Sequence, residues 1–191
     1  MLDSATDLRS ILKDPTLLTS QAYVAGEWVN AEDGKTFPVS NPARGDVICH
    51  VADMSRKDAA RAIAKADEVR REWAARTGKE RAAVMRKWFD LCMANQDDLA
   101  AILTAEMGKP LAEAKGEVAY GSGYIEWFGE EAKRIYGETI PGHQRDKRLT
   151  VIKQPIGVAA SITPWTFPNA MIARKVAPAL AAGCPVMAED R

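Results

Sequence analysis

The sequence predicts a mixed α/β fold, and three observations support this prediction. Residues 156–162 form a short apolar run, which is typical of a buried strand. Residues 170–182 are rich in alanine, with Pro168 just inside the start and Gly183 just past the end, which is a signature of a helix. The order strand, tight loop, helix is the one that α/β proteins use to build a site at the carboxyl end of a strand. We therefore expect the connecting loop to carry function.

Turn and capping signals define the elements that precede this unit. We expect residues 1–20 to form a loosely held amphipathic arm, and residues 23–51, where β-type runs alternate with turn residues, to form hairpins. Residues 147–153 are predicted to form an exposed strand. The expected helix starts are Ser55 with Asp58, Thr77 with Glu80, Asn95 with Asp98, and Pro110, and the expected ends of the first and last helix are Ala75 and Gly137. The expected inward-facing residues are Ile63, Ala66, Trp73, Val84, Trp88, Leu91, Cys92, Leu99, Ile102, Leu103, Val118, Ile125 and Phe128.

Composition and charge argue against several classes of function. The chain of 191 residues carries 26 basic and 26 acidic residues, which gives no indication of binding to nucleic acid or to an anionic membrane. No apolar run approaches the ~20 residues of a membrane span. The acidic start of the chain lacks the apolar stretch of a secretory signal. Three cysteines far apart in sequence fit the reduced cytosol, so we expect a cytoplasmic protein.

The cysteines and histidines do not form a catalytic or metal-binding pair in the sequence. Cys49 and His50 are neighbours in a β-type run, and such neighbours point to opposite faces of a strand, so they cannot converge on one ligand. Cys92 lies on the apolar stripe of a helix and Cys184 leads into a strand, so both are expected in the core. His143 is expected in a loop. The sequence therefore predicts no metal site.

Several separated blocks of the sequence resemble the aldehyde dehydrogenase superfamily. The segment ITPWTFPNAMIARKVAPALAAGC, at residues 162–184, is similar to the beginning of its cofactor domain, and the similarity starts near Tyr23. Residues 106–117, 124–131 and 151–158 resemble in particular the succinate-semialdehyde dehydrogenase group. The resemblance implies the N-terminal fragment of the aldehyde dehydrogenase fold, with β-hairpins, long helices and the start of a Rossmann-like parallel sheet.

The resemblance also implies how the chain is organised. Residues 1–20 would be an N-terminal arm, and residues 21–146 the N-terminal part of the cofactor-binding domain. Residues 147–155 would be the strand through which subunits of this family, which are homo-oligomers, pair with one another. Residues 156–191 would form an incomplete Rossmann-like βαβ unit, because a parallel sheet needs more strands than this one supplies.

By resemblance, the reaction is the oxidation of succinate semialdehyde to succinate with NAD or NADP, in the breakdown of 4-aminobutyrate. This chemistry needs a thiolate that attacks the aldehyde, and preorganised donors for the developing oxyanion. The cysteine nucleophile and the glutamate base of the family fall outside these 191 residues, so we expect the chain to be truncated and inactive alone. The alternative is a non-catalytic interaction module that pairs with a full-length aldehyde dehydrogenase subunit.

The resemblance assigns the cofactor contact to Ile162, Thr163, Pro164, Trp165 and Thr166. Thr166 stands at the position of the family's oxyanion-binding asparagine, which is a departure from the family pattern. A hydroxyl donates one hydrogen bond and has a shorter reach than an amide. Losing one such donor typically costs roughly 10²–10³-fold in rate. Thr166 is also suited to cap the helix that follows, and the two roles are compatible.

Arg174 is the residue that we expect to set specificity. By resemblance, it matches the arginine that binds the distal carboxylate of succinate semialdehyde, a role that suits the guanidinium fork. The alternative is that Arg174 and Lys175 form a solvated helix face.

The last residues depart from the family pattern. Glu189 stands about where the family has a lysine that contacts the ribose side of the cofactor, so its charge would oppose a 2′-phosphate. The resemblance ends abruptly within the last four residues. We expect a shift of reading frame to be the cause, with ordinary divergence at a terminus as the alternative.

Overall fold

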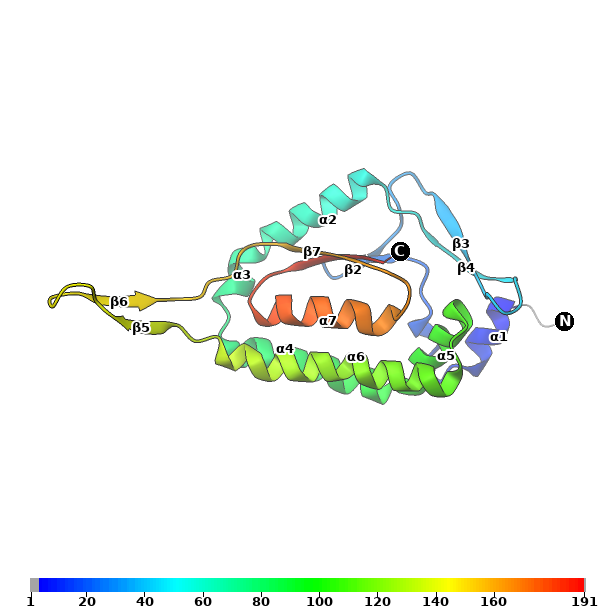
Figure 1. Cartoon of the computed structure of the whole chain (residues 1–191). Coiled ribbons are helices and arrows are strands. Elements are labelled where there is room, and N and C mark those ends of the chain that lie inside the picture. Colours follow the sequence, from blue (N-terminus) through cyan, green and yellow to red (C-terminus); the bar gives the residue numbers. More distant parts are fainter. Residues whose placement is uncertain (1–3, 191) are drawn as a thin grey trace.

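Layers of secondary structure stack on both sides of one helix in the computed structural model, which describes residues 4–190 (Figure 1). A parallel pair of strands, β7 (Ala159–Thr163) and β8 (Val186–Asp190), lies between helices α2 (Arg56–Glu68) and α7 (Pro168–Ala181). Helices α4 (Gly78–Ala94) and α6 (Leu111–Glu131) lie on the other side of α7. The predicted order of strand, helix and parallel strand is confirmed.

The first strand of this unit begins later than the sequence predicted. Residues 156–158 do not join the ladder, because Gly157 adopts a positive φ of 143° that takes the chain out of a strand conformation. Pairing begins where the Ala159 N–H donates to the Pro185 carbonyl at 2.9 Å. Ile156, predicted to lie in a buried strand, is 93% exposed. The prediction of a strand at 156–162 was therefore wrong at its first half.

Helix α7 has the boundaries that its sequence predicted. Pro168 occupies the first turn, and Gly183 adopts a φ of +91° just past the end, where the Cys184 N–H donates to the Ala179 carbonyl at 2.9 Å. The buried face of α7 consists of four alanines, which lets the helix approach its neighbours closely. These residues are Ala170, Ala173, Ala177 and Ala181. Three of them join Met85 and Ile125 in one hydrophobic cluster between α4, α6 and α7.

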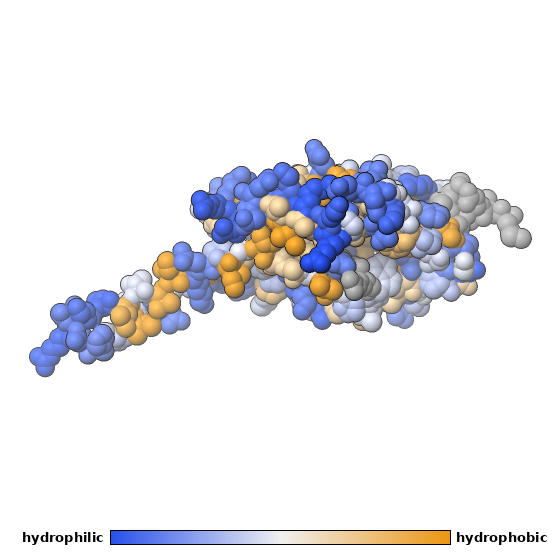
Figure 2. Space-filling model, turned by 90° about the horizontal axis from the view of Figure 1, so that it is seen from above, coloured by the Kyte–Doolittle hydropathy of each residue, from blue (hydrophilic) through white to orange (hydrophobic). Residues whose placement is uncertain are grey.

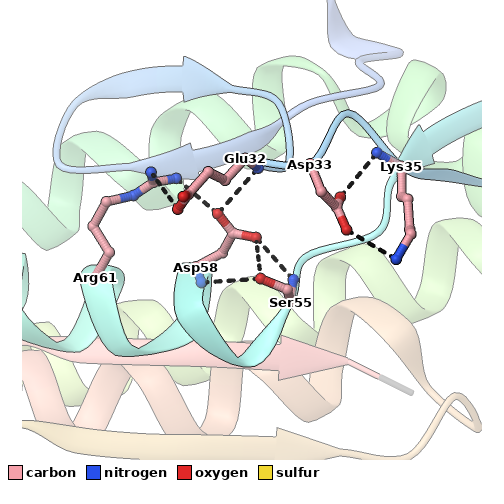
Figure 3. A network of polar contacts seen from close by, with 6 residues as sticks. All are labelled: Glu32, Asp33, Lys35, Ser55, Asp58 and Arg61. Atoms are coloured by element: carbon pink, nitrogen blue, oxygen red, sulfur yellow. Dashed lines mark hydrogen bonds and ion pairs between the residues drawn. The ribbon is translucent and has the colours of Figure 1, made fainter.

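The network around Asp58 explains why α2 begins where it does (Figure 3). Ser55 and Asp58 form the predicted capping box, in which the Asp58 carboxylate accepts from the Ser55 N–H at 2.9 Å and from its hydroxyl at 2.7 Å. The other Asp58 oxygen accepts from the Glu32 N–H at 3.2 Å and from Arg61 at 2.9 Å. These hydrogen bonds lower the pKa of Asp58, those from Ser55 most of all. The helix start is thereby fixed to the loop around Glu32.

The remaining helices are α1 (Ser4–Ile11), α3 (Arg70–Ala75) and α5 (Gln96–Met107), with 3₁₀ turns η1 (Pro15–Leu17) and η2 (Ala132–Arg134). Two predictions about helix ends are corrected here. The helix expected from Ser55 to Ala75 is interrupted at Val69, which ends α2 and precedes α3. Asn95 makes no side-chain cap at the start of α5. Asp98 accepts instead from the backbone N–H groups of Lys13 and Asp14, at 3.0 and 2.8 Å.

Helices α2 and α4 bury a smaller apolar surface than predicted. Ile63, Val84 and Leu91 were expected to face inward, and all three are exposed. On α4 the buried residues are Arg81 and Met85, on a neighbouring stripe of the same helix. Trp88 and Cys92, which were also expected to face inward, do pack against the cluster that contains Met85, so on α4 the prediction was wrong only for Val84 and Leu91. Helical periodicity identifies apolar faces without saying which face another element covers.

The N-terminal arm is held more firmly than predicted. Leu8, Leu12 and Leu18 are buried and pack against Ile48 of strand β4. The Arg9 guanidinium donates to the Leu18 carbonyl at 2.7 Å, which closes the turn after α1. The expectation of a loose arm was therefore wrong for residues 8–18, because its leucines have an apolar surface to cover.

Three antiparallel hairpins complete the fold, as the turn residues predicted for the first two. They are β1 (Ala22–Val24) with β2 (Glu27–Val29), β3 (Thr36–Ser40) with β4 (Val47–Ala52), and β5 (Glu138–Pro141) with β6 (Arg148–Val151). On β4, Cys49 is half-buried and His50 is exposed, as expected for neighbours on opposite faces. His143 lies in the connection between β5 and β6, as expected of a loop residue.

The β5–β6 hairpin stands away from the body of the molecule (Figures 1 and 2). Every residue of both strands is exposed. Ile140 pairs with Leu149 across the hairpin, and Val151 shares the face of Leu149, since alternate residues of a strand lie on one face. Figure 2 shows hydrophobic atoms along the hairpin and hydrophilic atoms at its tip. The hairpin therefore carries one apolar face that the described residues leave uncovered.

Candidate functional site

The segment from Ile162 to Phe167 is the candidate site, and it lies where β7 ends and α7 begins. Ile162 is 67% exposed and Trp165 is 40% exposed, so the segment presents an apolar strip to the outside. Pro164 and Thr166 are also exposed. Thr163 is buried at 2% exposure, so a ligand would meet its backbone rather than its side chain. Four of the five predicted cofactor residues are thus accessible together.

The first turn of α7 is capped by an acid from another helix. Phe167 is the N-cap residue and makes no side-chain cap. Glu117 of α6, which is 3% exposed, accepts from the Asn169 N–H at 2.9 Å and from the Ala170 N–H at 3.3 Å. A carboxylate at this position satisfies N–H groups that a helix start leaves without a partner and interacts favourably with the helix dipole. The prediction that Thr166 caps α7 was wrong, because Glu117 has taken that role.

Glu117 is itself paired with a cation. The Lys109 ammonium makes an ion pair with the second Glu117 oxygen, and the side chains of both residues are almost fully buried. The same ammonium lies 3.7 Å from the centroid of the Phe167 ring, within the range of a cation–π contact. Lys109, Glu117 and the first turn of α7 therefore form one connected cluster beside Thr166.

Sequence reasoning missed both Lys109 and Glu117 as residues of the site. Both lie within residues 106–117, which resemble the aldehyde dehydrogenase superfamily. In the sequence, however, a lysine just before a helix and a glutamate eight residues later on it look like ordinary surface charges. The burial of Glu117 depends on how α7 packs on α6, and no local pattern encodes that packing. The signal that was available is the run of small residues near Gly121, which predicts a close helix contact without naming the partner.

The far end of α7 is held by a buried cation. Arg81 of α4 donates from Nε to the Ala181 carbonyl at 3.0 Å and from Nη1 to the Arg76 carbonyl. The Trp73 indole N–H donates to the Leu180 carbonyl at 3.1 Å. A cation at the C-terminus complements the helix dipole as the Glu117 carboxylate does at the N-terminus. Both ends of α7 are therefore fixed by side chains from other elements.

Arg174 of α7 interacts with Tyr120 of α6, which in turn contacts Tyr124. The rings of Tyr120 and Tyr124 meet edge to face, with centroids 5.0 Å apart, and their hydroxyls share a hydrogen bond. That hydrogen bond raises the pKa of Tyr120, and the nearby Arg174 guanidinium partly offsets the rise. The Arg174 residue itself is half-buried. A guanidinium and two phenol hydroxyls together supply hydrogen-bond donors and positive charge, which is the chemistry that binds a carboxylate.

The three cysteines are free thiols. Burial, more than the nearby Glu106 carboxylate, raises the pKa of Cys49, and burial raises that of Cys92. A raised pKa disfavours the thiolate that nucleophilic catalysis requires. Cys184 is buried beyond the opposite end of α7. None of these thiols is arranged as the nucleophile of the candidate site.

The segment lies at the carboxyl end of a parallel strand. In α/β proteins nucleotides bind at the carboxyl ends of parallel strands, and Ile162, Pro164 and Trp165 are exposed at that end of β7. Glu189 of β8 pairs in register with Ile162 and brings a carboxylate to the same region. Among residues 4–190, no group of three or more His, Cys, Asp or Glu side chains is placed to hold a metal ion. None of the helices within the same range is long and apolar enough to cross a membrane.

A parallel βαβ unit places the chain in the class of α/β proteins, in which ligands bind at the carboxyl ends of the strands. The sequence model of the protein family described as "Aldehyde dehydrogenase family" matches residues 28–189 of the chain. The chain belongs to the aldehyde dehydrogenase family, as the sequence blocks predicted. The structure is the N-terminal part of that fold.

Individual relatives support the same assignment. The chain is 61% identical, over 92% of its length, to a glutarate-semialdehyde dehydrogenase of Pseudomonas aeruginosa. Over the same share it is 56% identical to an NADP(+) succinate-semialdehyde dehydrogenase of Escherichia coli and 54% identical to a 3-sulfolactaldehyde dehydrogenase of Pseudomonas putida. It is similar to the crystal structure of a succinate-semialdehyde dehydrogenase from Burkholderia pseudomallei, with a TM-score of 0.93 and 56% identity over 94% of this chain and 37% of that one. The chain spans 36% of the length of each of the three curated relatives.

Proposed function

We propose that this chain is the N-terminal part of an NAD- or NADP-dependent dehydrogenase that oxidises succinate semialdehyde or a closely similar aldehyde with a distal anionic group. The observation that carries the proposal is Arg174, which lies on the helix that follows the candidate site and whose guanidinium interacts with Tyr120. An α-helix rises 1.5 Å per residue, so Arg174 lies about 9 Å along the axis from Pro168. That separation suits an aldehyde whose reacting carbon and anionic end are a few carbons apart.

The names of the relatives support an anionic substrate. Succinate semialdehyde and glutarate semialdehyde each carry a carboxylate at the end opposite the aldehyde, and 3-sulfolactaldehyde carries a sulfonate there. A guanidinium fork binds either group with two hydrogen bonds. We therefore assign Arg174 to the distal anion rather than to a solvated helix face.

Thr166 would act on the aldehyde oxygen. When bound, the nicotinamide cofactor supplies the acceptor for the hydride that leaves the substrate. The exposed strip from Ile162 to Thr166 would hold the cofactor through backbone and ring contacts. The Thr166 hydroxyl would donate one hydrogen bond to the oxygen as negative charge develops on it. The Glu189 carboxylate, in register with Ile162, would disfavour a cofactor with a 2′-phosphate.

The first test joins this chain to the remaining part of the Escherichia coli relative and compares Arg174→Ala with the parent protein. Losing a charge-assisted contact of about 1.5–3 kcal/mol should lower kcat/KM for succinate semialdehyde by about 10²-fold. Butanal, which lacks a carboxylate, should hardly be affected. Lys175→Ala is the matched control, since Lys175 is the exposed neighbour on the same helix. Equal losses for both aldehydes would mean that Arg174 holds the helix instead of reading the substrate.

The second test concerns Thr166 in the same joined protein. Thr166→Asn should raise kcat by about 10²-fold, because an amide places its donor closer to the carbonyl oxygen. KM for the aldehyde should change little, because the donor acts mainly on the developing charge. An unchanged or lower kcat would remove Thr166 from the proposed chemistry.

The 191-residue chain alone should not reduce NAD⁺ or NADP⁺ with any aldehyde, because none of its cysteines is arranged as a nucleophile. We also propose that residues 147–155, which include β6, pair with another family subunit. The uncovered apolar face of the β5–β6 hairpin supports this role. Three free thiols support a location in the cytoplasm.

A further inference from the structure

The charged pair formed by Lys109 and Glu117 contacts the residues that directly follow Thr166. Lys109 contacts the ring of Phe167, one residue after Thr166, and Glu117 binds the N–H groups of Asn169 and Ala170. We propose that Lys109 and Glu117 are positioning residues, which fix the loop that carries Thr166 against helix α6. The catalytic consequence rests on the proposed function, whereas the positioning itself can be measured without any activity.

Glu117 acts as an acceptor shared by two backbone donors and one cation. One carboxylate oxygen accepts from Asn169 and Ala170, at 2.9 and 3.3 Å, and the other meets the Lys109 ammonium. Three partners around one carboxylate leave it little freedom to move. Since the two N–H groups belong to the first turn of α7, the position of that turn follows the position of Glu117.

Lys109 extends the cluster to the residue next to Thr166. Lys109 lies in the connection between α5 and α6, and its side chain is only 9% exposed. Its ammonium therefore bridges two elements, with Glu117 on one side and the Phe167 ring at 3.7 Å on the other. A cation–π contact of a desolvated ammonium is stronger than an exposed one, so Phe167 is held where the loop turns into the helix.

Gly121 adds a steric limit to these polar contacts. It lies one turn after Glu117 on the same face of α6. A Cβ atom at Gly121 would lie 2.2 Å from the Asn169 side-chain oxygen and 3.2 Å from the Ala170 Cα. The first turn of α7 is therefore pressed against α6 at the level where Glu117 binds it. Polar and steric contacts therefore converge on residues 167–170, which directly follow Thr166.

A positioning role explains why Lys109 and Glu117 form a buried ion pair, since such a pair adds little net stability. Replacing a buried ion pair by apolar residues is often neutral for stability, because burying the charges costs as much as their attraction returns. A donor that has to meet an oxyanion needs accurate placement, and a displacement of 1 Å can cost about 10²-fold in rate. The pair would supply accuracy at Thr166 rather than net stability.

The first experiment measures amide hydrogen exchange in the 191-residue chain. Glu117→Ala should accelerate exchange at Asn169 and Ala170 by about 10-fold or more, which is the factor for losing a hydrogen bond to a charged group. Glu117→Gln keeps an acceptor oxygen and should restore most of the protection. Glu113→Gln, an exposed acid one turn earlier on α6, is the matched control and should leave both amides unchanged. Equal exchange in Glu117→Ala and the control would overturn the proposal.

A double-mutant cycle tests whether Lys109 and Glu117 act as a unit. Lys109→Met leaves a buried carboxylate without its cation, and Glu117→Ala leaves a buried ammonium without its anion. The double variant removes both charges, so its exchange rates should rise less than the product of the two single effects. Additive effects would mean that the two residues hold the loop independently, which contradicts the proposed pair.

The second experiment uses the joined enzyme described above, and it also serves if the chain alone does not stay in solution. Glu117→Ala and Lys109→Met should lower kcat by about 10-fold or more while KM for the aldehyde stays within about twofold, because the loop positions a donor for the transition state. A rise in KM with unchanged kcat would overturn the proposal. If the exchange data support positioning while Arg174→Ala affects both aldehydes equally, the proposed substrate fails and the positioning pair stands.

Discussion

Helix α7 and the β5–β6 hairpin are held in opposite ways. Both ends of α7 are bound by buried charges from other elements, Glu117 at the start and Arg81 at the end, and its alanine face is buried. The hairpin pairs only with itself among the described residues, and each of its strand residues is exposed. One region is fixed by the chain that contains it, and the other extends away from that chain (Figure 1).

This difference separates two structural tasks. A catalytic donor has to keep its place to within a fraction of an ångström, so the element that carries it needs fixed contacts at both ends. A hairpin of two strands is marginal in water by itself, so a covering partner adds a large share of its stability. The contrast predicts that substitutions at the ends of α7 change folding, whereas those on the hairpin change association.

The largest effect is expected at the C-terminal end of α7. Arg81→Met keeps the aliphatic stem but removes the guanidinium that donates to the Ala181 and Arg76 carbonyls. The free energy of unfolding should fall by about 2–4 kcal/mol, since a buried carbonyl at Ala181 and a partly buried one at Arg76 lose a charged donor. Urea unfolding of the 191-residue chain, followed by circular dichroism, measures this change.

Arg86→Met is the matched control on the same helix. Arg86 is exposed and pairs with Glu126 at 2.8 Å and Asp90 at 3.2 Å on the surface, so its loss should cost less than about 1 kcal/mol. If Arg81→Met were as mild as Arg86→Met, the end of α7 would not be fixed by Arg81, and the contrast with the hairpin would lose half its support.

A half-buried carboxylate in the body, that of Glu106, sharpens the comparison with Glu117. Burial raises the pKa of Glu106, near the end of α5, to about 7. An unfolded glutamate titrates near about 4.3. The ionised Glu106 carboxylate therefore destabilises the folded chain. This destabilisation grows as the pH rises from about 4 to about 7 and stays constant above that.

Glu106→Gln removes this opposition and should stabilise the chain by about 1–3 kcal/mol at pH 8. At pH 3 the gain should nearly vanish, because Glu106 is then almost fully protonated in both the folded and the unfolded state. Unfolding curves at the two pH values measure the difference. Glu130→Gln, at an exposed position of α6, should stay within about 0.5 kcal/mol at both. A gain at Glu106 that did not depend on pH would show that the carboxylate is not held away from water.

Local signals correctly predicted the helix ends that are determined by residues close to them in the sequence. The Pro168 and Gly183 positions fixed α7, and the Ser55–Asp58 capping box fixed the start of α2. The errors arose where a distant element decides the outcome. Val84 and Leu91 have the spacing of a buried stripe, but α6 and α7 cover a different stripe of α4. Helical periodicity alone cannot choose between two apolar stripes.

The candidate site divides in the same way. The resemblance located the loop from Ile162 to Thr166, and the structure shows which of its side chains are exposed. Glu117 could not have been assigned from the sequence, because the Asn169 N–H that it binds lies 52 residues further along the chain. Contacts of this range depend on how α6 and α7 pack, which no window of the sequence contains.

The smallest effect on folding is expected on the hairpin. Leu149 and Val151 share one face of β6, next to Ile140 across the pair, and Thr150 lies on the other face. Leu149→Lys with Val151→Lys should leave the free energy of unfolding within about 0.5 kcal/mol, because these side chains are exposed in the single chain. The same change should abolish association of the chain with itself or with a full-length relative, since it places two charges on the apolar face.

Sedimentation velocity over a range of concentrations measures this association, and Thr150→Lys is the control on the opposite face. The control should associate as the parent chain does, because the apolar face stays intact. If the parent chain remained a monomer and failed to bind a full-length relative, residues 147–155 would not be a pairing surface. If the Leu149 and Val151 variant instead unfolded more readily than the parent, the hairpin would be held by the body of its own chain, and the contrast with α7 would be wrong.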